Sequence, residues 1–272
     1  MAKINESERT AQNHVVRFFQ KPDGLNYTYY GNFENQINKN IIPEKLSAWL
    51  SSKNGGSLSQ GLIDKAIDEL TKAANNLQQG LYKANQDVYS LLKYGAKVKE
   101  NQGEPEKTVY FIDWEHSQNN EFAIAEEVTI KENNATRRPD IVVYINGIAI
   151  AVIELKKSTK SVSTGIRQLE SNQTEHFNKP FFTTVQFVMA GNSSEGLRYA
   201  PIDTKEKYFL EWKNDTVNTN AQPLDDVSLD INENCKMLND KLDIQSLSDF
   251  LCKWKILLER NPFFSKLNGK LV

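Results

Sequence analysis

The sequence of 272 residues has little of what marks secreted, membrane-spanning or zinc-binding proteins. It contains two cysteines, Cys235 and Cys252, and three histidines in separate segments, and these make no zinc-ligand spacing. Its first residues lack the apolar segment of a signal peptide, so we expect reduced thiols and a cytoplasmic location. The apolar runs are far shorter than a membrane span, so we expect no membrane association.

Two further features are missing. The net charge is only −2, so no overall basic field attracts nucleic acid, and any DNA contact must come from a local patch or a partner subunit. The chain also has no Gly-x-x-x-x-Gly-Lys-Ser/Thr phosphate loop, and Asn268-Gly269-Lys270 has no strand and helix around it to make one. We therefore expect no ATP-driven motor within these residues.

The composition is that of an ordinary globular protein, and the spacing of apolar residues changes along the chain from a helical to a strand pattern. The fractions are 39% hydrophobic and 25% charged. Helical patterns cover residues 6–20, 41–50, 58–77 (with Ser57 as a cap) and 81–94 (closed by Gly95). A loop is expected at 97–107. Strand patterns follow at 108–114, 122–130, 140–155, 185–190 and 197–200, with a helix at 163–177, a polar linker at 214–223 and helices at 225–238 and 247–258.

The most informative segment runs from Arg138 to Lys156 and reads as two apolar strands joined by a turn. It places Asp140, Glu154 and Lys156 in apolar surroundings, where a charge costs several kcal/mol unless it is paired or binds a metal. Residues two apart in a strand share a face, so Glu154 and Lys156 point the same way. Carboxylate oxygens are ligands that Mg²⁺ prefers, and a lysine ammonium can position water or neutralise charge on a phosphate. This set predicts metal-dependent phosphodiester hydrolysis.

The hairpin itself must be irregular for that chemistry to work. A regular two-residue turn at residues 146–147 would pair Asp140 with Ile153, and Asp140 would then face away from Glu154. A three-residue turn with Gly147 left-handed in a bulge, or a bulge farther along the hairpin, restores a common face. We therefore predict that the hairpin is not a regular two-residue one and that the carboxylates of Asp140 and Glu154 converge.

The Pro139-Asp140 and Glu154-Leu155-Lys156 pattern resembles the PD-(D/E)xK nuclease signature. A longer set of segments resembles the R subunits of type I restriction–modification enzymes: residues 8–16, 120–122, 137–140, 145–147, 152–156, Gln168 and 211–213. This resemblance implies a PD-(D/E)xK restriction-endonuclease-like α/β core, with a mixed central sheet flanked by helices and with N-terminal and C-terminal helical additions. We expect an endonuclease domain at 1–260, with its catalytic core at about 108–213 and closing helices at 225–260. Residues 261–272 would begin a connection to a motor region that this chain lacks.

The resemblance also implies roles and partners. Asp140 and Glu154 would hold Mg²⁺, Lys156 would be the catalytic amine, and Gln168 a supporting residue. The substrate would be double-stranded DNA, ATP would act only through the absent motor domains, and the partners would be methyltransferase and specificity subunits. Relatives carry Gln-x-x-x-Tyr on the helix after the motif lysine, whereas this chain has Asn172 in place of the tyrosine, so aromatic stacking on DNA is lost.

Several assignments stay open at this point. The candidates for contacts to DNA phosphates are Arg138, Lys157, Lys160, Arg167 and Asn172. An additional carboxylate from an N-terminal helix could be Glu34 or Glu44. The alternative to a nuclease is a non-cleaving PD-(D/E)xK-like module that docks the motor and methyltransferase subunits, although a degraded site would be expected to have lost at least one of its three charged residues.

Overall fold

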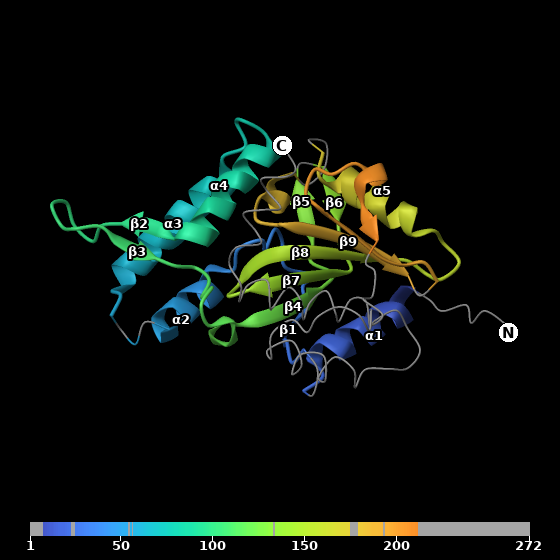
Figure 1. The fold of residues 1–272 in the computed structure, drawn as a ribbon, viewed down its shortest axis with the longest axis horizontal. Helices are drawn as coiled ribbons and strands as arrows, with labels where there is room; N and C mark the ends of the chain where they lie inside the picture. Colours follow the sequence, from blue (N-terminus) through green and yellow to red (C-terminus); the bar gives the residue numbers. More distant parts are fainter. Residues whose placement is uncertain are drawn as a thin grey trace, which may run out of the picture.

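A computed structural model describes residues 8–22, 25–53, 55, 57–132, 134–174, 179–192 and 194–211. Within these ranges the chain forms a mixed α/β fold with a seven-stranded central sheet and five α-helices, as expected of a PD-(D/E)xK-like nuclease core (Figure 1). The predicted linker at 214–223, the closing helices at 225–260 and the segment 261–272 lie outside the described residues. So do Trp212 and both cysteines.

The helices have bounds close to those that the sequence predicts. They are α1 (Glu8–Gln20), α2 (Pro43–Lys53), α3 (Gln60–Asn75), α4 (Leu81–Tyr94) and α5 (Val162–Asn172). Gly95 ends α4 as predicted, with φ +75° and its N–H bonded to the carbonyl of Leu91. The cap of α3 is Ser59, whose hydroxyl accepts the N–H of Leu62, so the prediction of Ser57 as this cap is wrong. The last helix is also shorter than predicted, since α5 ends at Asn172.

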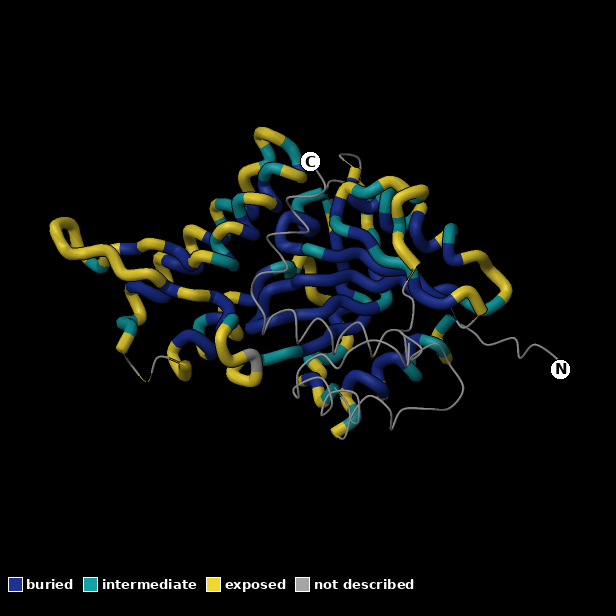
Figure 2. Tube along the Cα trace, in the orientation of Figure 1, coloured by how far each residue is buried: buried dark blue, intermediate teal, exposed yellow. Residues whose placement is uncertain are grey.

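The central sheet follows the order β1-β4-β7-β8-β9-β10-β11. Its strands are β1 (Thr28–Asn32), β4 (Phe122–Glu126), β7 (Ile141–Ile145), β8 (Ile148–Leu155), β9 (Phe187–Asn192), β10 (Gly196–Pro201) and β11 (Leu210–Glu211). The β1–β4 and β8–β9 pairs are parallel, and the other neighbours are antiparallel. Every residue of β8 is buried, as expected for a strand that is covered on both faces (Figure 2).

Each face of the sheet has its own apolar layer. On one face, Val143 and Ile153 belong to a cluster that includes residues of α1, α2 and α3. On the other face, Val142 and Val152 belong to a cluster that includes residues of α5. Because side chains alternate along a strand, this division fixes which face each residue near the strand ends presents.

Short strands account for most of what the sequence did not predict. Strand β1 was missed, and the predicted loop at 97–107 lies partly in a hairpin of β2 (Ala96–Val98) and β3 (Lys107–Val109) that projects from the sheet in Figure 1. The predicted strand at 122–130 is divided: β4 ends at Glu126, and β5 (Ile130–Glu132) pairs instead with β6 (Ala135–Arg137). A three-residue strand offers too few positions for a period of two to be recognised.

The turn between β7 and β8 is anchored by Asn146, which is fully buried. Its Oδ1 accepts the N–H of Glu121, and its Nδ2 donates to the carbonyl of Phe111 and to Oδ1 of Asn120, at 2.7, 2.9 and 2.9 Å. Gly147 follows with φ +82°, and a Cβ there would lie 2.8 Å from Cβ of Lys45, so only glycine fits. The bonds of Asn146 hold the turn against residues 111–121, and the absence of a side chain at Gly147 lets the turn lie close to α2.

Candidate active site

The hairpin of β7 and β8 combines a tight turn with a bulge. Asn146 and Gly147 both have positive φ, and the flanking residues Ile145 and Ile148 pair directly, so the turn has two residues and the three-residue turn considered from the sequence is wrong. The register then shifts between Val143 and Tyr144. The prediction of an irregular hairpin is therefore confirmed, through the alternative of a bulge farther along the strands.

The extra residue in β8 is Ile150. Tyr144 pairs with Ala149, while Val143 pairs with Ala151, which leaves Ile150 without an opposite residue. The register ends with Ile141 opposite Ile153, and its continuation places Asp140 opposite Glu154. Opposed residues share a face, so the bulge brings the two carboxylates to the same side of the sheet.

That side is the one covered by α5. Val142 and Val152 belong to the α5 layer, and Asp140, Glu154 and Lys156 follow the same alternation. Gly165 on α5 lies over the lysine: a Cβ added to it would stand 3.5 Å from Cγ and 3.7 Å from Cε of Lys156. The absence of a side chain at Gly165 lets the helix approach the lysine stem closely.

Glu154 is a buried carboxylate with few partners. Its side chain is 1% exposed, Oε2 lies 3.5 Å from Nζ of Lys156, and Oε1 has no hydrogen-bond partner. Burial, followed by the charge of Asp140, raises the pKa of Glu154 to about 8, and Lys156 acts in the opposite direction. The ammonium of Lys156 also donates to the carbonyl of Leu155 at 3.1 Å.

Asp140 lies just before the first residue of β7, and both its side chain and its backbone carbonyl accept hydrogen bonds. Its Oδ2 accepts the N–H of Leu155 at 2.6 Å, and its backbone carbonyl accepts the N–H of Glu127 at 3.2 Å. Burial raises the pKa of Asp140 to about 6; the Leu155 N–H and Lys156 lower it, and Glu127 and Glu8 raise it. Besides Glu154, whose own pKa the charge of Asp140 raises, the acidic groups that act on Asp140 are Glu127 and Glu8.

The sequence did not single out Gln12, Glu127 or Glu8. Gln12 is 3% exposed and lies one turn before Val15 and Val16 on the apolar side of α1, where a polar residue is unusual. That position in the apolar stripe was the available signal. Glu127 has φ +51°, and this left-handed backbone, which ends the strand pairing of β4, has no sequence signature in a glutamate.

The residues considered for DNA contact or support divide into several groups. Arg138 binds Oε1 of Glu34 at 2.6 Å, and Arg167 lies 3.2 Å from Oε1 of Glu206; both arginines are exposed. Lys157 is half-buried and Lys160 exposed, in the loop that follows β8, and Gln168 is half-buried on α5.

Asn172 does not face solvent. It is fully buried, its Oδ1 accepts from Nε of Arg137 at 3.2 Å, and its Nδ2 has no partner. A buried amide presents no group to a phosphate, so the structure gives the predicted DNA contact of Asn172 no support. Glu44 is exposed in the first turn of α2, and Glu34 is paired with Arg138; neither is among the groups that raise the pKa of Asp140.

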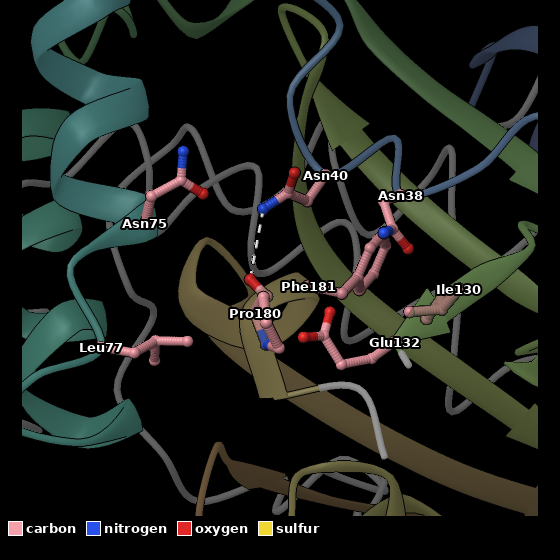
Figure 3. A pocket seen from close by; sticks show the side chains of 8 residues that line it. All are labelled: Asn38, Asn40, Asn75, Leu77, Ile130, Glu132, Pro180 and Phe181. Carbon is pink, nitrogen blue, oxygen red and sulfur yellow. Dashed lines mark hydrogen bonds between the residues drawn. The ribbon is translucent and has the colours of Figure 1, made fainter. Parts of the chain in front are cut away.

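A hollow of about 360 Å³ lies elsewhere, between α3 and the β5 strand (Figure 3). Two of its polar side chains have partners: the amide of Asn38 bonds to the N–H and carbonyl of Lys131, and the amide of Asn40 donates to the carbonyl of Pro180. None of the residues that line it is Asp140, Glu154 or Lys156. The described residues also contain no group of three His, Cys, Asp or Glu placed to hold one metal, so the carboxylate pair is what the site offers.

Asp140 and Glu154 lie inside a segment that matches a known protein family. Residues 5–207 match the family described as the type I restriction enzyme R protein N terminus. The chain belongs to this family. The resemblance found in the sequence is thereby confirmed, and the described core lies in the region that matches the N terminus of type I restriction enzyme R proteins.

Two similar proteins are named as subunits of type I restriction enzymes. The chain is 27% identical over 211 residues to the type I restriction enzyme HindI endonuclease subunit of Haemophilus influenzae, a match that covers 75% of this chain and 19% of that protein. It is 32% identical over 219 residues to the putative type I restriction enzyme MjaIXP endonuclease subunit of Methanocaldococcus jannaschii, covering 77% and 20%. The match thus spans about a fifth of the length of these relatives. No helix among the described residues is long and apolar enough to cross a bilayer.

Proposed function

We propose that this chain is the Mg²⁺-dependent endonuclease part of a type I restriction enzyme and hydrolyses phosphodiester bonds of double-stranded DNA. Cleavage would follow ATP-driven translocation by motor domains that these residues do not contain. The observation that carries the proposal is the bulge at Ile150, because it turns Asp140 toward the face that Glu154 and Lys156 share. A regular two-residue hairpin would have separated these groups.

The carboxylate oxygens of the site suit a hard divalent cation. Oε1 of Glu154 is buried without a hydrogen-bond partner, and the carboxylate of Asp140 is held through Oδ2 by the N–H of Leu155. A buried carboxylate oxygen without a donor is costly unless a cation or water satisfies it. Asp140 and Glu154 would hold Mg²⁺, which when bound supplies a Lewis acid and an acidified water.

The other residues act on the phosphate and the nucleophile. The ammonium of Lys156, fixed by the carbonyl of Leu155 and by Glu154, would orient the attacking water or neutralise the charge that develops on the phosphate. Gln168 would support the site from α5. Arg138, Lys157, Lys160 and Arg167 would contact backbone phosphates, with the two arginines leaving their present carboxylate partners.

The complete enzyme would supply what these residues lack. Methyltransferase and specificity subunits would bring the site to DNA and read its sequence, and the motor would use ATP. Because the described surface carries ion pairs at its candidate DNA-binding arginines, we expect the chain alone to bind DNA weakly and in a salt-sensitive way. We propose a cytoplasmic location.

The test is cleavage by the assembled restriction enzyme. Asp140→Ala, Glu154→Ala and Lys156→Ala are each expected to abolish double-strand cleavage while ATP-driven translocation continues, because none of these residues would serve the motor. Glu69→Gln and Lys72→Ala, an exposed ion pair on α3, are the matched controls and should cleave normally. Full cleavage by any of the three variants would remove that residue from the site. Absence of metal-dependent cleavage by the unmodified enzyme would favour the docking module instead.

A further inference from the structure

Gln12 bridges α1 to the end of the catalytic hairpin. Its Nε2 donates to the backbone carbonyl of Asp140 at 3.0 Å and to Oε1 of Glu127 at 3.2 Å. Gln12 is 3% exposed, so its amide is shielded from bulk water, whereas the carboxylate side chain of Glu127 is 27% exposed. An amide nitrogen has two hydrogens, and the two acceptors use both.

Asp140 depends on such contacts because it is outside the strand ladder. Strand β7 begins at Ile141, so the position of Asp140 is set by bonds beyond the regular pairing. Its carbonyl has two donors, the N–H of Glu127 and the amide of Gln12, and its carboxylate has the N–H of Leu155. Without Gln12 the carbonyl keeps a single donor at 3.2 Å.

The remaining donor, the N–H of Glu127, belongs to a residue whose own backbone conformation depends on surrounding contacts. Glu127 has φ +51°, a region that non-glycine residues seldom occupy and that persists only where surrounding contacts fix it. Gln12 binds the carboxylate of Glu127, and Nη1 of Arg9, one turn earlier on α1, lies 3.9 Å from the same oxygen. The side chain of Gln12 thus fixes Asp140 directly, and it also fixes Glu127, whose N–H binds the carbonyl of Asp140.

We propose that Gln12 is a positioning residue that holds Asp140 in the geometry needed to bind the divalent cation. The inference rests on the proposed function, since it assigns Gln12 a role in the same site. Outer-shell partners of metal ligands typically change metal affinity by about 10–100-fold when they are removed. Gln12 acts through Asp140 and touches neither the cation nor the DNA.

The experiment is an Mn²⁺ titration of this chain, followed by the electron paramagnetic resonance signal of the free ion. Gln12→Met removes the donor and keeps the length of the side chain, and we expect the Mn²⁺ dissociation constant to rise about tenfold. Asn85→Leu is the matched control. Asn85 is another buried amide that donates to two carbonyls, those of Thr183 and Val185, but lies outside the site. It should lose stability while its Mn²⁺ affinity stays unchanged.

Gln12→Ala provides a second variant if Gln12→Met does not fold. It also removes the donor and adds no charge, so loss of positioning again predicts weaker Mn²⁺ binding. Weaker binding by the folded Gln12 variants, with Asn85→Leu unchanged, supports the inference.

The other outcomes overturn it. Unchanged or tighter binding by a folded Gln12 variant, while Asp140→Ala loses binding, removes Gln12 from the site and leaves the nuclease proposal standing. If the unmodified chain binds no Mn²⁺ that depends on Asp140 and Glu154, both proposals fail together.

Discussion

The substitution Glu154→Gln should stabilise the metal-free protein although it removes a proposed ligand. The carboxyl group is 1% exposed and has one cationic neighbour, Lys156, at 3.5 Å. Burial and the nearby charge of Asp140 raise its pKa from 4.5 to about 8. In the folded, metal-free state its ionised form is therefore disfavoured.

The sign and size of the effect follow from linkage. A carboxyl group whose pKa is raised on folding binds more protons in the folded state, so stability is lost as the pH rises from the unfolded pKa to the folded one. With pKa values of 4.5 and about 8, that loss is about 1 kcal/mol at pH 5 and about 4 kcal/mol at pH 8. Glutamine carries no charge at either pH, so the variant should recover most of this difference.

The measurement is urea unfolding of both proteins in EDTA at pH 5 and pH 8. We expect Glu154→Gln to raise the free energy of unfolding at pH 8 by several times the gain at pH 5. Asp113→Asn is the control of opposite sign. Hydrogen bonds from Lys53 and Asn119 outweigh burial and hold the pKa of Asp113 well below its usual range, so this variant should be less stable at pH 8. If the free energy of unfolding rises equally at the two pH values, or does not rise, the raised pKa of the buried Glu154 carboxyl group is refuted.

Two further substitutions test the supports of the site. Asn146→Ala removes three buried hydrogen bonds at the turn and puts alanine at φ +51°, so the free energy of unfolding should fall by about 3 kcal/mol or more in urea titrations. Gly165→Ala places a Cβ 3.1 Å from that of Ala190, so α5 or β9 must move by a few tenths of an ångström beside Lys156. Cleavage by the assembled enzyme should fall, and Ala190→Gly in the same chain should restore it; no recovery would mean that this contact does not act on the lysine.

The sequence determined the elements whose signals lie close together along the chain. The helix that ends at Gly95 could be predicted because a glycine after an apolar 3.6-residue pattern marks a helix end locally. The apolar runs around Asp140 and Glu154 predicted a buried strand pair, and the period of two exposed a conflict in a regular hairpin. That conflict was enough to predict an irregularity, because one extra residue reverses which face a strand residue presents.

Only the tertiary structure decided where the irregularity falls and what holds it. A bulge can form at several positions of an apolar run at similar local cost. Here it forms at Ile150, while the two-residue turn lies close to α2. Which donors reach the carbonyl of Asp140 depends on how α1 packs against the sheet, since Gln12 and Asp140 are 128 residues apart. Local propensity carries no information on such contacts, because they arise when separate elements pack together.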